Sequence, residues 1–289
     1  MIPPSFEYVR PTTISEAIAL LEQHGEDAKV LSGGQSLIPM MKLRLARPAW
    51  IVDINAIPGL GGIREEGGFL QIGGLVREAD IETSELIRTR YPILHDTARV
   101  IADPLVRNLA TAGGNLAHGD PANDHPATML ALRAEVVAAG PKGERSIAID
   151  DFFVSIFTTA LEPAEILTQI RIPIPPPGSG GAYFKLERKV GDFATAGVAA
   201  QLTVDANGTC RQVGIGLTNV GPTPIRARKA EEALRGKKLD EAAAGRAAQL
   251  AADESQPSSD LRGPEEYKRG LVKELTRRAL VRALERARR

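Results

Sequence analysis

Two short segments combine a glycine pair with small polar side chains. Residues 32–36 read Ser-Gly-Gly-Gln-Ser, and residues 111–115 read Thr-Ala-Gly-Gly-Asn. Glycine permits positive φ values and lets the backbone approach a ligand closely. Successive N–H groups in such a turn can point into one concavity that suits phosphate oxygens. Neither segment contains Lys or Arg, so the pattern predicts an anion site held by N–H groups together with Ser36, Thr111 and Asn115.

Either glycine pair alone is weak evidence, because an ordinary tight turn uses the same residues. Two such segments about 80 residues apart are stronger evidence, since together they could grip the two phosphates of a dinucleotide from both sides. The usual phosphate motifs are missing: no G-x-G-x-x-G follows a predicted strand, and no G-x-x-x-x-G-K-[ST] occurs. A Rossmann or P-loop site is therefore not expected.

The first glycine segment lies between a strand pattern and a helix pattern. Thr13 and Glu16 have capping-box spacing, which predicts a helix that Gly25 can end. Strands are expected at residues 28–31 and 50–54, and a helical run at 37–45.

The second glycine segment is expected to form a turn between helices. Helices are predicted at residues 77–87, 93–101 and 126–134. Strands are predicted at 135–139 and 166–172. Residues 61–75 read as a hairpin with strands at 62–64 and 69–72 that turns at Gly67-Gly68.

Residues 173–181, rich in proline and glycine, are the clearest break in the chain and predict an exposed connector. We therefore expect a first domain at 1–177, with subdomains at about 1–55 and 56–177, and a second at 178–289. The second domain should contain strands at 183–188, 196–204 and 213–218, helical sequence at 226–252 and a last helix at 264–289. That helix has a local basic excess, read as a docked helix with a solvated face or as a patch for an acidic partner.

Composition excludes several classes of protein. The 289 residues contain 36 Lys and Arg against 36 Asp and Glu, so a role in nucleic-acid binding is not expected. The single cysteine, Cys210, allows no internal disulfide, cysteine zinc site or thiolate-held iron–sulfur cluster. No metal site is expected, because His118 and His125 have no third ligand nearby. No signal peptide or membrane-spanning run is visible, which favours a cytoplasmic location.

Longer strings resemble a known family, the FAD-binding medium subunits of the molybdenum hydroxylases, which include xanthine dehydrogenase and aerobic carbon monoxide dehydrogenase. The matching strings are residues 32–39, 111–115, 120–124 and 221–227. The resemblance covers essentially the whole chain. It is closest to the carbon monoxide dehydrogenase branch of the family, through residues 119–126, 189–196 and 259–267.

The resemblance implies an α+β fold. It predicts the p-cresol methylhydroxylase-type FAD-binding fold of two α+β subdomains, followed by a C-terminal domain with a small antiparallel sheet and helices. It also implies partners: a large subunit with a molybdenum cofactor and a small subunit with two [2Fe–2S] clusters, assembled as a dimer of heterotrimers. Electrons would reach FAD from those clusters and leave to an external acceptor. The complex could associate with the inner face of the membrane.

The resemblance assigns FAD-binding roles to individual residues. The first pyrophosphate loop would comprise Leu31, Ser32, Gly33, Gly34, Gln35, Ser36, Leu37 and Ile38, and the second Thr111, Ala112, Gly113, Gly114 and Asn115. Asp124 would hydrogen-bond FAD, Ile101 would border the flavin, Leu167 would line the adenine side, Lys185 would lie near the isoalloxazine edge and Phe193 would stand against the ring. Plainer interpretations remain for Asp124 as a helix N-cap and for Lys185 as a solvated strand residue.

No residue of this chain is expected to act as a general base or nucleophile on an organic substrate. Three alternatives stay open at this point. The chain could serve a related aldehyde or N-heterocycle dehydrogenase, act alone as a flavin oxidoreductase of the same fold, or be a module that has lost flavin.

Overall fold

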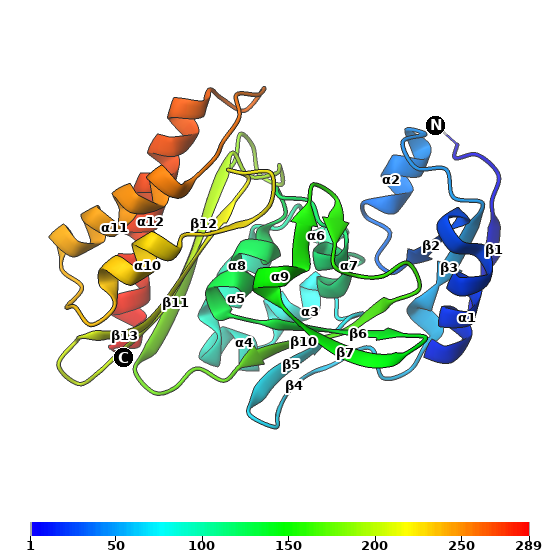
Figure 1. The fold of residues 1–289 in the computed structure, drawn as a ribbon, viewed down its shortest axis with the longest axis horizontal. Helices are drawn as coiled ribbons and strands as arrows, with labels where there is room; N and C mark the ends of the chain where they lie inside the picture. Colours follow the sequence, from blue (N-terminus) through cyan, green and yellow to red (C-terminus); the bar gives the residue numbers. More distant parts are fainter. Residues whose placement is uncertain (1, 289) are drawn as a thin grey trace.

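Three groups of elements, each built on its own sheet, follow one another along the longest axis of the molecule (Figure 1). The computed structural model describes residues 2–288. Within that range, no helix is both long enough and apolar enough to cross a membrane.

The first group is a parallel sheet of order β1-β3-β2 with helices beside it. Its elements are β1 (Glu7–Val9), α1 (Ile14–His24), η1 (Gly25–Asp27), β2 (Ala28–Leu31), α2 (Leu37–Lys42), β3 (Trp50–Asp53) and η2 (Ile54–Ala56). The predicted N-cap at Thr13 is confirmed, because its hydroxyl accepts from the Glu16 N–H at 3.1 Å. The reciprocal bond of a capping box is not formed, since the Glu16 carboxylate accepts from the N–H of Thr12 at 2.9 Å and not from that of Thr13. Glycine at residue 25, with φ 53°, ends the helix as expected.

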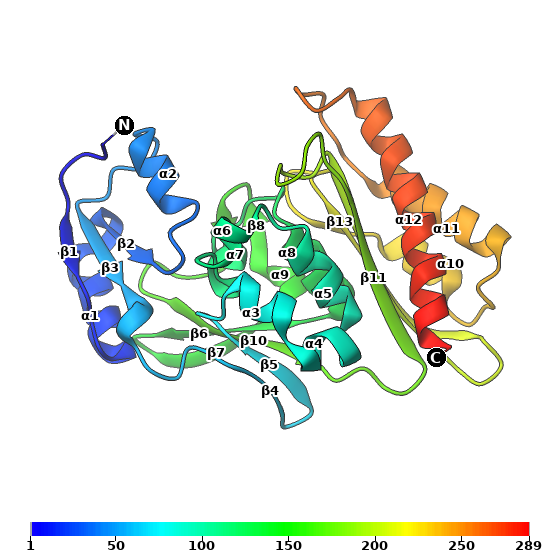
Figure 2. The ribbon, with the colours of Figure 1, turned by 180° about the vertical axis from the view of Figure 1, so that it is seen from behind.

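The second group is an antiparallel sheet of order β4-β5-β10-β6-β7, covered on one face by short helices (Figure 2). The strands are β4 (Ile63–Glu66), β5 (Phe69–Gly73), β6 (Glu135–Gly140), β7 (Gly143–Ala148) and β10 (Ile166–Pro173). The helices are α3 (Glu78–Thr83), α4 (Glu85–Arg90), α5 (Pro92–Arg99), α6 (Pro104–Arg107), α7 (Ala112–Ala117), α8 (Asp124–Leu132) and α9 (Ile149–Phe152). A small hairpin pairs β8 (Phe153–Ser155) with β9 (Thr158–Thr159).

Two sequence predictions for this group are wrong in detail. The helix expected at 77–87 is two helices, because the chain is extended at Ser84, whose hydroxyl accepts from the Ile87 N–H and caps α4. The second glycine segment, expected as a turn, lies in the helix α7. The strand β7 was not predicted, since only Ile147 and its neighbours carry an apolar signal.

The third group is an antiparallel sheet packed between two layers of helices (Figure 1). Its order is β11 (Ser179–Leu186), β12 (Ala196–Val204), β13 (Cys210–Thr218) and β14 (Ile225–Arg226). One face packs on α5 and α8, and the other packs on α12 (Glu265–Ala287), with α10 (Arg228–Leu234) and α11 (Glu241–Glu254) beside it. The burial on both sides explains why β12 is buried at nearly every position.

The connector at residues 173–181 is shorter than predicted. Pro173 still belongs to β10, and Gly180 and Gly181 are buried in β11. A Cβ on Gly180 would lie 2.2 Å from the Ala283 carbonyl oxygen of α12. Glycine at this position therefore serves close packing of a helix on a strand, and local composition alone could not distinguish this from a turn.

Candidate functional site

The first glycine segment forms the turn between β2 and α2. Gly34 has φ 71°, a conformation that favours glycine. Within residues 2–288, no protein group accepts a hydrogen bond from the backbone N–H groups of residues 33–37. Ser36, at the N-terminus of α2, makes no side-chain cap bond either. The first segment therefore presents five successive backbone donors without a protein partner, which is what an anion site would need, and the anion site stays a prediction.

The second glycine segment differs, because its backbone donors already have protein partners. Thr111 is the N-cap of α7, and its hydroxyl accepts from the Gly114 N–H at 3.1 Å. The N–H groups of Ala112 and Gly113 donate to the carbonyls of Val76 and Gly74 at 2.9 and 3.2 Å. The expectation that both segments present free N–H groups is therefore wrong for the second. In the second segment, side chains would therefore make the contacts with a ligand, and the glycines would let the ligand approach because they carry no side chain.

The two segments lie side by side although 79 positions separate their hydroxyl residues. The Ser32 Oγ and Thr111 Oγ1 atoms are 2.7 Å apart. A Cβ on Gly33 would lie 2.4 Å from the Leu109 carbonyl oxygen, so this glycine permits backbone-to-backbone contact between the segments. A Cβ on Gly113 would lie 2.5 Å from the Gly74 carbonyl oxygen. These two glycines are required by packing within the chain.

Gly114 and Asn115 face the same junction. A Cβ on Gly114 would lie 2.7 Å from the Thr111 hydroxyl and 3.8 Å from the Ser32 Cβ. The Asn115 Oδ1 atom is buried and has no partner within the described chain, while the Asn115 carbonyl accepts from Asn123 Nδ2 at 2.8 Å. A buried oxygen of this kind needs a donor from outside the chain.

Two residues that sequence reasoning missed also lie here. Asn55 Nδ2 donates to the Ser32 carbonyl at 2.9 Å, and its Oδ1 accepts from Arg77 Nη2 at 2.6 Å. Arg77 Nη1 donates to the Leu109 carbonyl at 2.5 Å. No local pattern marks either residue, because the contacts join parts of the chain that are distant in sequence.

A second cluster surrounds Asp124. This residue is 5% exposed and is the first residue of α8, whereas the N-cap is Asn123. The N-cap interpretation of Asp124 is therefore wrong. Its carboxylate accepts from Tyr183 Oη at 2.6 Å and from Lys185 Nζ at 3.0 Å.

Lys185 is buried as well, with a side chain 2% exposed, so the interpretation as a solvated strand residue is also wrong. Its Nζ donates to the Val100 carbonyl at 2.9 Å and lies 3.3 Å from Glu187 Oε2. The ammonium group therefore joins β11 of the third group to α8 and to the end of α5. Buried charges need such partners, because desolvation of an unpaired charge is costly.

Burial governs the titration of this cluster. It raises the pKa of the Asp124 carboxyl above its ordinary value, although the Lys185 charge and the Tyr183 hydroxyl act in the opposite direction. Burial, followed by the Asp124 charge, raises the pKa of Tyr183 well above its ordinary value. Tyr183 therefore stays protonated and serves as a donor.

The two histidines of this region have separate partners. His125 Nε2 lies 2.6 Å from Glu78 Oε2, and both side chains are fully buried. Burial lowers the pKa of His125, but the Glu78 charge and hydrogen bond outweigh it and hold the pKa above its ordinary value. The His118 ring packs against Phe157 with a centroid distance of 5.1 Å.

The remaining predicted residues fall around these two clusters. Leu167 is buried next to the second glycine segment, since a Cβ on Gly74 would lie 2.4 Å from its carbonyl oxygen. Ile101 is buried beside Val100, which binds Lys185. Phe193 is 47% exposed, and the Arg262 guanidinium lies 5.9 Å from its ring centroid. Of the first loop, Ile38 is exposed, Leu31 and Leu37 are half-buried, and Gln35 Nε2 donates to the Gly33 carbonyl.

Known protein families match almost the whole of this chain. The model of a family described as "FAD binding domain in molybdopterin dehydrogenase" matches residues 4–175, and that of the "CO dehydrogenase flavoprotein C-terminal domain" matches residues 181–283. The carbon monoxide dehydrogenase medium chain of Hydrogenophaga pseudoflava is 46% identical over 280 residues, which is 97% of each chain.

A further relative and a solved structure support the same family. The 6-hydroxypseudooxynicotine dehydrogenase complex subunit alpha of Paenarthrobacter nicotinovorans is 38% identical over 288 residues, covering 100% of this chain and 97% of the relative. A solved structure of carbon monoxide dehydrogenase from Hydrogenophaga pseudoflava, lacking the Mo-pyranopterin moiety, superposes with a TM-score of 0.96 at 48% identity, over 99% of each chain. The predicted α+β fold is confirmed, and this chain belongs to the family of FAD-binding medium subunits of the molybdenum hydroxylases.

Proposed function

We propose that this chain is the FAD-binding electron-transfer subunit of a molybdenum-containing hydroxylase of the carbon monoxide dehydrogenase type. The observation that carries the proposal is the meeting of the two glycine segments, whose Ser32 and Thr111 hydroxyls are 2.7 Å apart beside five free N–H groups. Membership of the whole chain in a family of FAD-binding subunits supports the same conclusion.

The residues present at the junction fit the pyrophosphate of FAD. The N–H groups of residues 33–37 offer donors without a basic side chain in the segment. Thr111 supplies a hydroxyl, Asn115 supplies a buried oxygen without a partner, and Gly114 keeps a side chain away from the Thr111 hydroxyl. Backbone dipoles of this kind hold phosphate oxygens at little cost in reorganisation. We assign residues 31–38 and 111–115 to this end of the site, with Leu167 on the adenine side.

The second cluster suits the flavin end. We assign Ile101, Asp124, Lys185 and Phe193 to the surroundings of the isoalloxazine ring. FAD, when bound, supplies the electron-transfer chemistry, and the protein supplies binding, orientation and electrostatics. The Asp124–Lys185 pair holds fixed, buried charges at this end, and Tyr183 keeps the carboxylate in place through its 2.6 Å hydrogen bond.

The assembly is part of the proposal. The only cysteine, Cys210, is buried in β13, so this chain has no thiolate set for a cluster. Electrons would come from [2Fe–2S] clusters on a small subunit, after substrate oxidation at a molybdenum cofactor on a large subunit, and would pass to an external acceptor. We propose a dimer of heterotrimers in the cytoplasm, with association at the inner face of the membrane through the complex. We also propose the domain division at 1–177 and 178–289.

A second candidate is the medium subunit of a related aldehyde or N-heterocycle dehydrogenase. The relative from Paenarthrobacter nicotinovorans favours it, because that protein matches this chain over its whole length and is named for a 6-hydroxypseudooxynicotine dehydrogenase complex. Substrate turnover by the purified complex on carbon monoxide, an aldehyde and an N-heterocycle separates the two candidates. Turnover of an organic substrate by this chain alone would contradict both.

The visible absorption spectrum of the purified chain tests the site. Wild-type protein should show bound or reconstitutable flavin. Gly114→Val should lose FAD, because the added side chain occupies the space beside Ser32 and Thr111, while far-ultraviolet circular dichroism keeps its wild-type shape. The control is Gly245→Val, where an added Cβ meets no atom within 4 Å. Wild-type flavin content in Gly114→Val would refute the loop assignment.

A further inference from the structure

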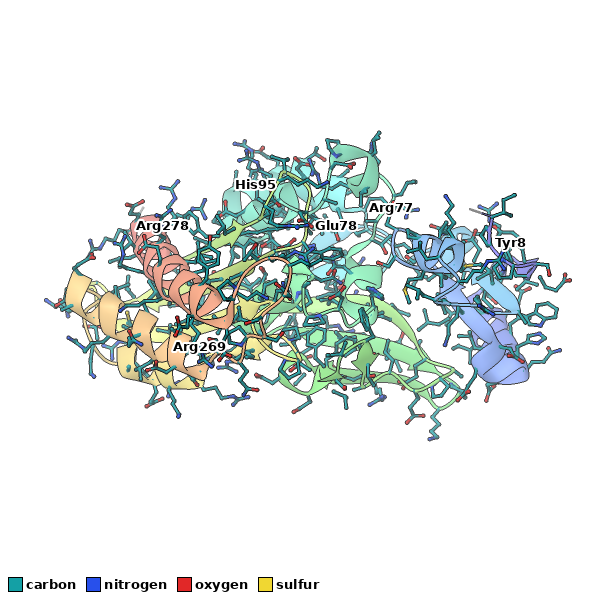
Figure 3. All side chains as sticks on the ribbon, turned by 90° about the horizontal axis from the view of Figure 1, so that it is seen from above. Tyr8, Arg77, Glu78, His95, Arg269 and Arg278 are labelled. Atoms are coloured by element: carbon teal, nitrogen blue, oxygen red, sulfur yellow. The ribbon has the colours of Figure 1, made fainter. Side chains whose placement is uncertain are left out.

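Arg77 connects the two groups of elements that carry the glycine segments. It lies between β5 and α3, at the side of the central group that faces the N-terminal elements (Figure 3). Its backbone forms an antiparallel bridge with Thr111, through the Glu78 N–H to the Ala110 carbonyl at 3.0 Å and the Ala112 N–H to the Val76 carbonyl at 2.9 Å. The second glycine segment is therefore held by the backbone around Arg77.

The side chain of Arg77 reaches the first segment through Asn55. The Asn55 amide is oriented by its own contacts, since its Nδ2 donates to the Ser32 carbonyl at 2.9 Å and to Asp53 Oδ1 at 2.6 Å. Its remaining oxygen accepts from Arg77 Nη2 at 2.6 Å. Ser32 in turn contacts the Thr111 hydroxyl at 2.7 Å. The residues Arg77, Asn55, Ser32 and Thr111 thus form a closed ring of contacts, which we call the clasp.

The second acceptor of Arg77 is the Leu109 carbonyl, at 2.5 Å from Nη1. The same carbonyl oxygen is the atom that a Cβ on Gly33 would meet at 2.4 Å. Arg77 therefore fixes the backbone on which Gly33 rests. A planar guanidinium can serve two acceptors at once in a fixed geometry, and a lysine ammonium on a flexible stem does not reproduce this.

The clasp is the polar half of the contact between the first and second groups. On the other side of the contact, Ala17, Ile18 and Val52 share an apolar cluster with Ala139 and Ile166. Apolar contacts hold the two groups together but fix their relative orientation only weakly, because such contacts are non-directional. The hydrogen bonds of the clasp fix that orientation at the end of the contact where the free N–H groups lie.

We propose that Arg77 is a positioning residue of the FAD site, which acts through Asn55 and the Leu109 carbonyl to hold the first glycine segment in register with the second. The inference rests on the proposed function. In this role Arg77 needs no contact with the cofactor. It keeps the N–H groups of residues 33–37 and the Asn115 side chain aimed at one pyrophosphate, so that binding does not have to order them.

The test is the affinity of the FAD-free full chain for FAD, followed by flavin fluorescence. Arg77→Lys keeps the charge and removes the two-acceptor geometry, so the dissociation constant should rise by about ten- to a hundredfold. The matched control is Arg145→Lys, because Arg145 likewise binds a side-chain oxygen and a backbone carbonyl, those of Glu165 and Ala160, but only within the second group. The control should keep wild-type affinity.

Two readouts separate positioning from general weakening of the fold. The absorption spectrum of flavin bound to Arg77→Lys should match wild type, because the change is at the phosphate end. Asn55→Ala should also weaken binding. Adding Arg77→Lys to Asn55→Ala should weaken binding by a smaller factor than Arg77→Lys does in the wild-type chain, because the two residues share one of the two contacts that Arg77 makes. Thermal unfolding of the FAD-free variants should resemble that of the Arg145→Lys control.

The outcomes are distinct. Wild-type affinity in Arg77→Lys, an altered flavin spectrum, or multiplied effects in the double variant would each overturn the positioning role while leaving the proposed function in place. A wild-type chain that binds no FAD would overturn the proposed function, and this inference with it.

Discussion

At the scale of single residues, Lys185 shows how a buried charge ties separate elements together. Its ammonium group lies within hydrogen-bond distance of the Asp124 carboxylate and the Val100 carbonyl, and both side chains of the ion pair are almost fully buried. Removing one partner of such a pair leaves the other desolvated and uncompensated. Removing one partner should therefore cost more folding free energy than the attraction between the two charges contributes.

Lys185→Met should lower the free energy of unfolding by about 3–5 kcal/mol, because Asp124 is left buried without its cation. Asp124→Asn in the same chain should restore much of the loss by removing the orphaned charge. Urea unfolding measures both, with Lys189→Met as a control at an exposed position. Equal stability of the single and double variants would contradict the ion-pair account.

His125 should make stability depend on pH. Its pKa in the folded chain is raised above the ordinary 6.5, by the Glu78 charge and hydrogen bond acting against burial. A group with a raised folded pKa contributes stability that is full below the unfolded value and is lost as pH rises through the folded value. The free energy of unfolding should therefore fall as the pH is raised above 6.5.

The measurement is urea unfolding of wild type and His125→Gln at several pH values from below 6.5 upward. The difference between the two proteins should be largest at the acid end and shrink with rising pH. A constant difference would show that the histidine stays in one charge state over that range.

At the scale of elements, the sequence predicted those that obey local rules. The helix α1 has its N-cap at Thr13 and its terminal glycine, the middle of β6 is apolar, and β10 carries apolar side chains at both ends and alternates them with polar ones. The helix α7 was missed, because Ala-Gly-Gly-Asn is poor helical sequence. Its first turn is held by bonds from Ala112 and Gly113 to the distant carbonyls of Val76 and Gly74, which no local pattern records.

The residues of the candidate site likewise fall into those that the sequence revealed and those that it did not. The glycine segments were visible in the sequence because their composition is unusual, and Asp124 and Lys185 followed from the family resemblance. Asn55 and Arg77 were not found, since ordinary polar residues give no signal until the chain brings them together. The difference between free and occupied N–H groups in the two segments likewise depends on long-range contacts.

Gly180 is a position where an added side chain would meet the backbone of another element. A Cβ there would lie 2.2 Å from the Ala283 carbonyl oxygen and 2.4 Å from the Ala287 nitrogen, both backbone atoms of α12. Gly180→Ala should therefore destabilise the chain by about 1–3 kcal/mol through overpacking. Gly245→Ala, in the open on α11, should instead stabilise by up to about 1 kcal/mol. Thermal unfolding would show the opposite signs, and a loss of the same size in both would point to a nonspecific effect.

At the scale of the whole molecule, the third group is not an independent unit, because one face of its sheet packs on helices of the second group. The sheet of β11, β12 and β13 is covered by α5 and α8 of the second group, and Arg286 of α12 reaches Asp96 of α5 at 2.5 Å. A domain with its own core separates easily, whereas a sheet that shares its apolar face does not. The proposed division near residue 177 therefore lies in a chain whose two parts remain packed together.

Cutting the connector should leave the molecule intact. With a protease site inserted between Pro176 and Pro177, the cleaved chain should elute from a size-exclusion column at the position of the uncut protein. Denaturing electrophoresis confirms the cut. Separate elution of the two fragments would mean that the shared face contributes little to their association.

The unequal state of the two glycine segments has a consequence for how occupancy can be observed. Amide protons of residues 33–37 have no acceptor in the described chain, so they should exchange rapidly with deuterated solvent when the cofactor is absent. Those of residues 112–115 are bonded already and should exchange slowly whether or not it is present. A single peptide covering the β2–α2 turn would thus report the fraction of subunits loaded with flavin, and the α7 peptide would serve as an internal reference within the same spectrum.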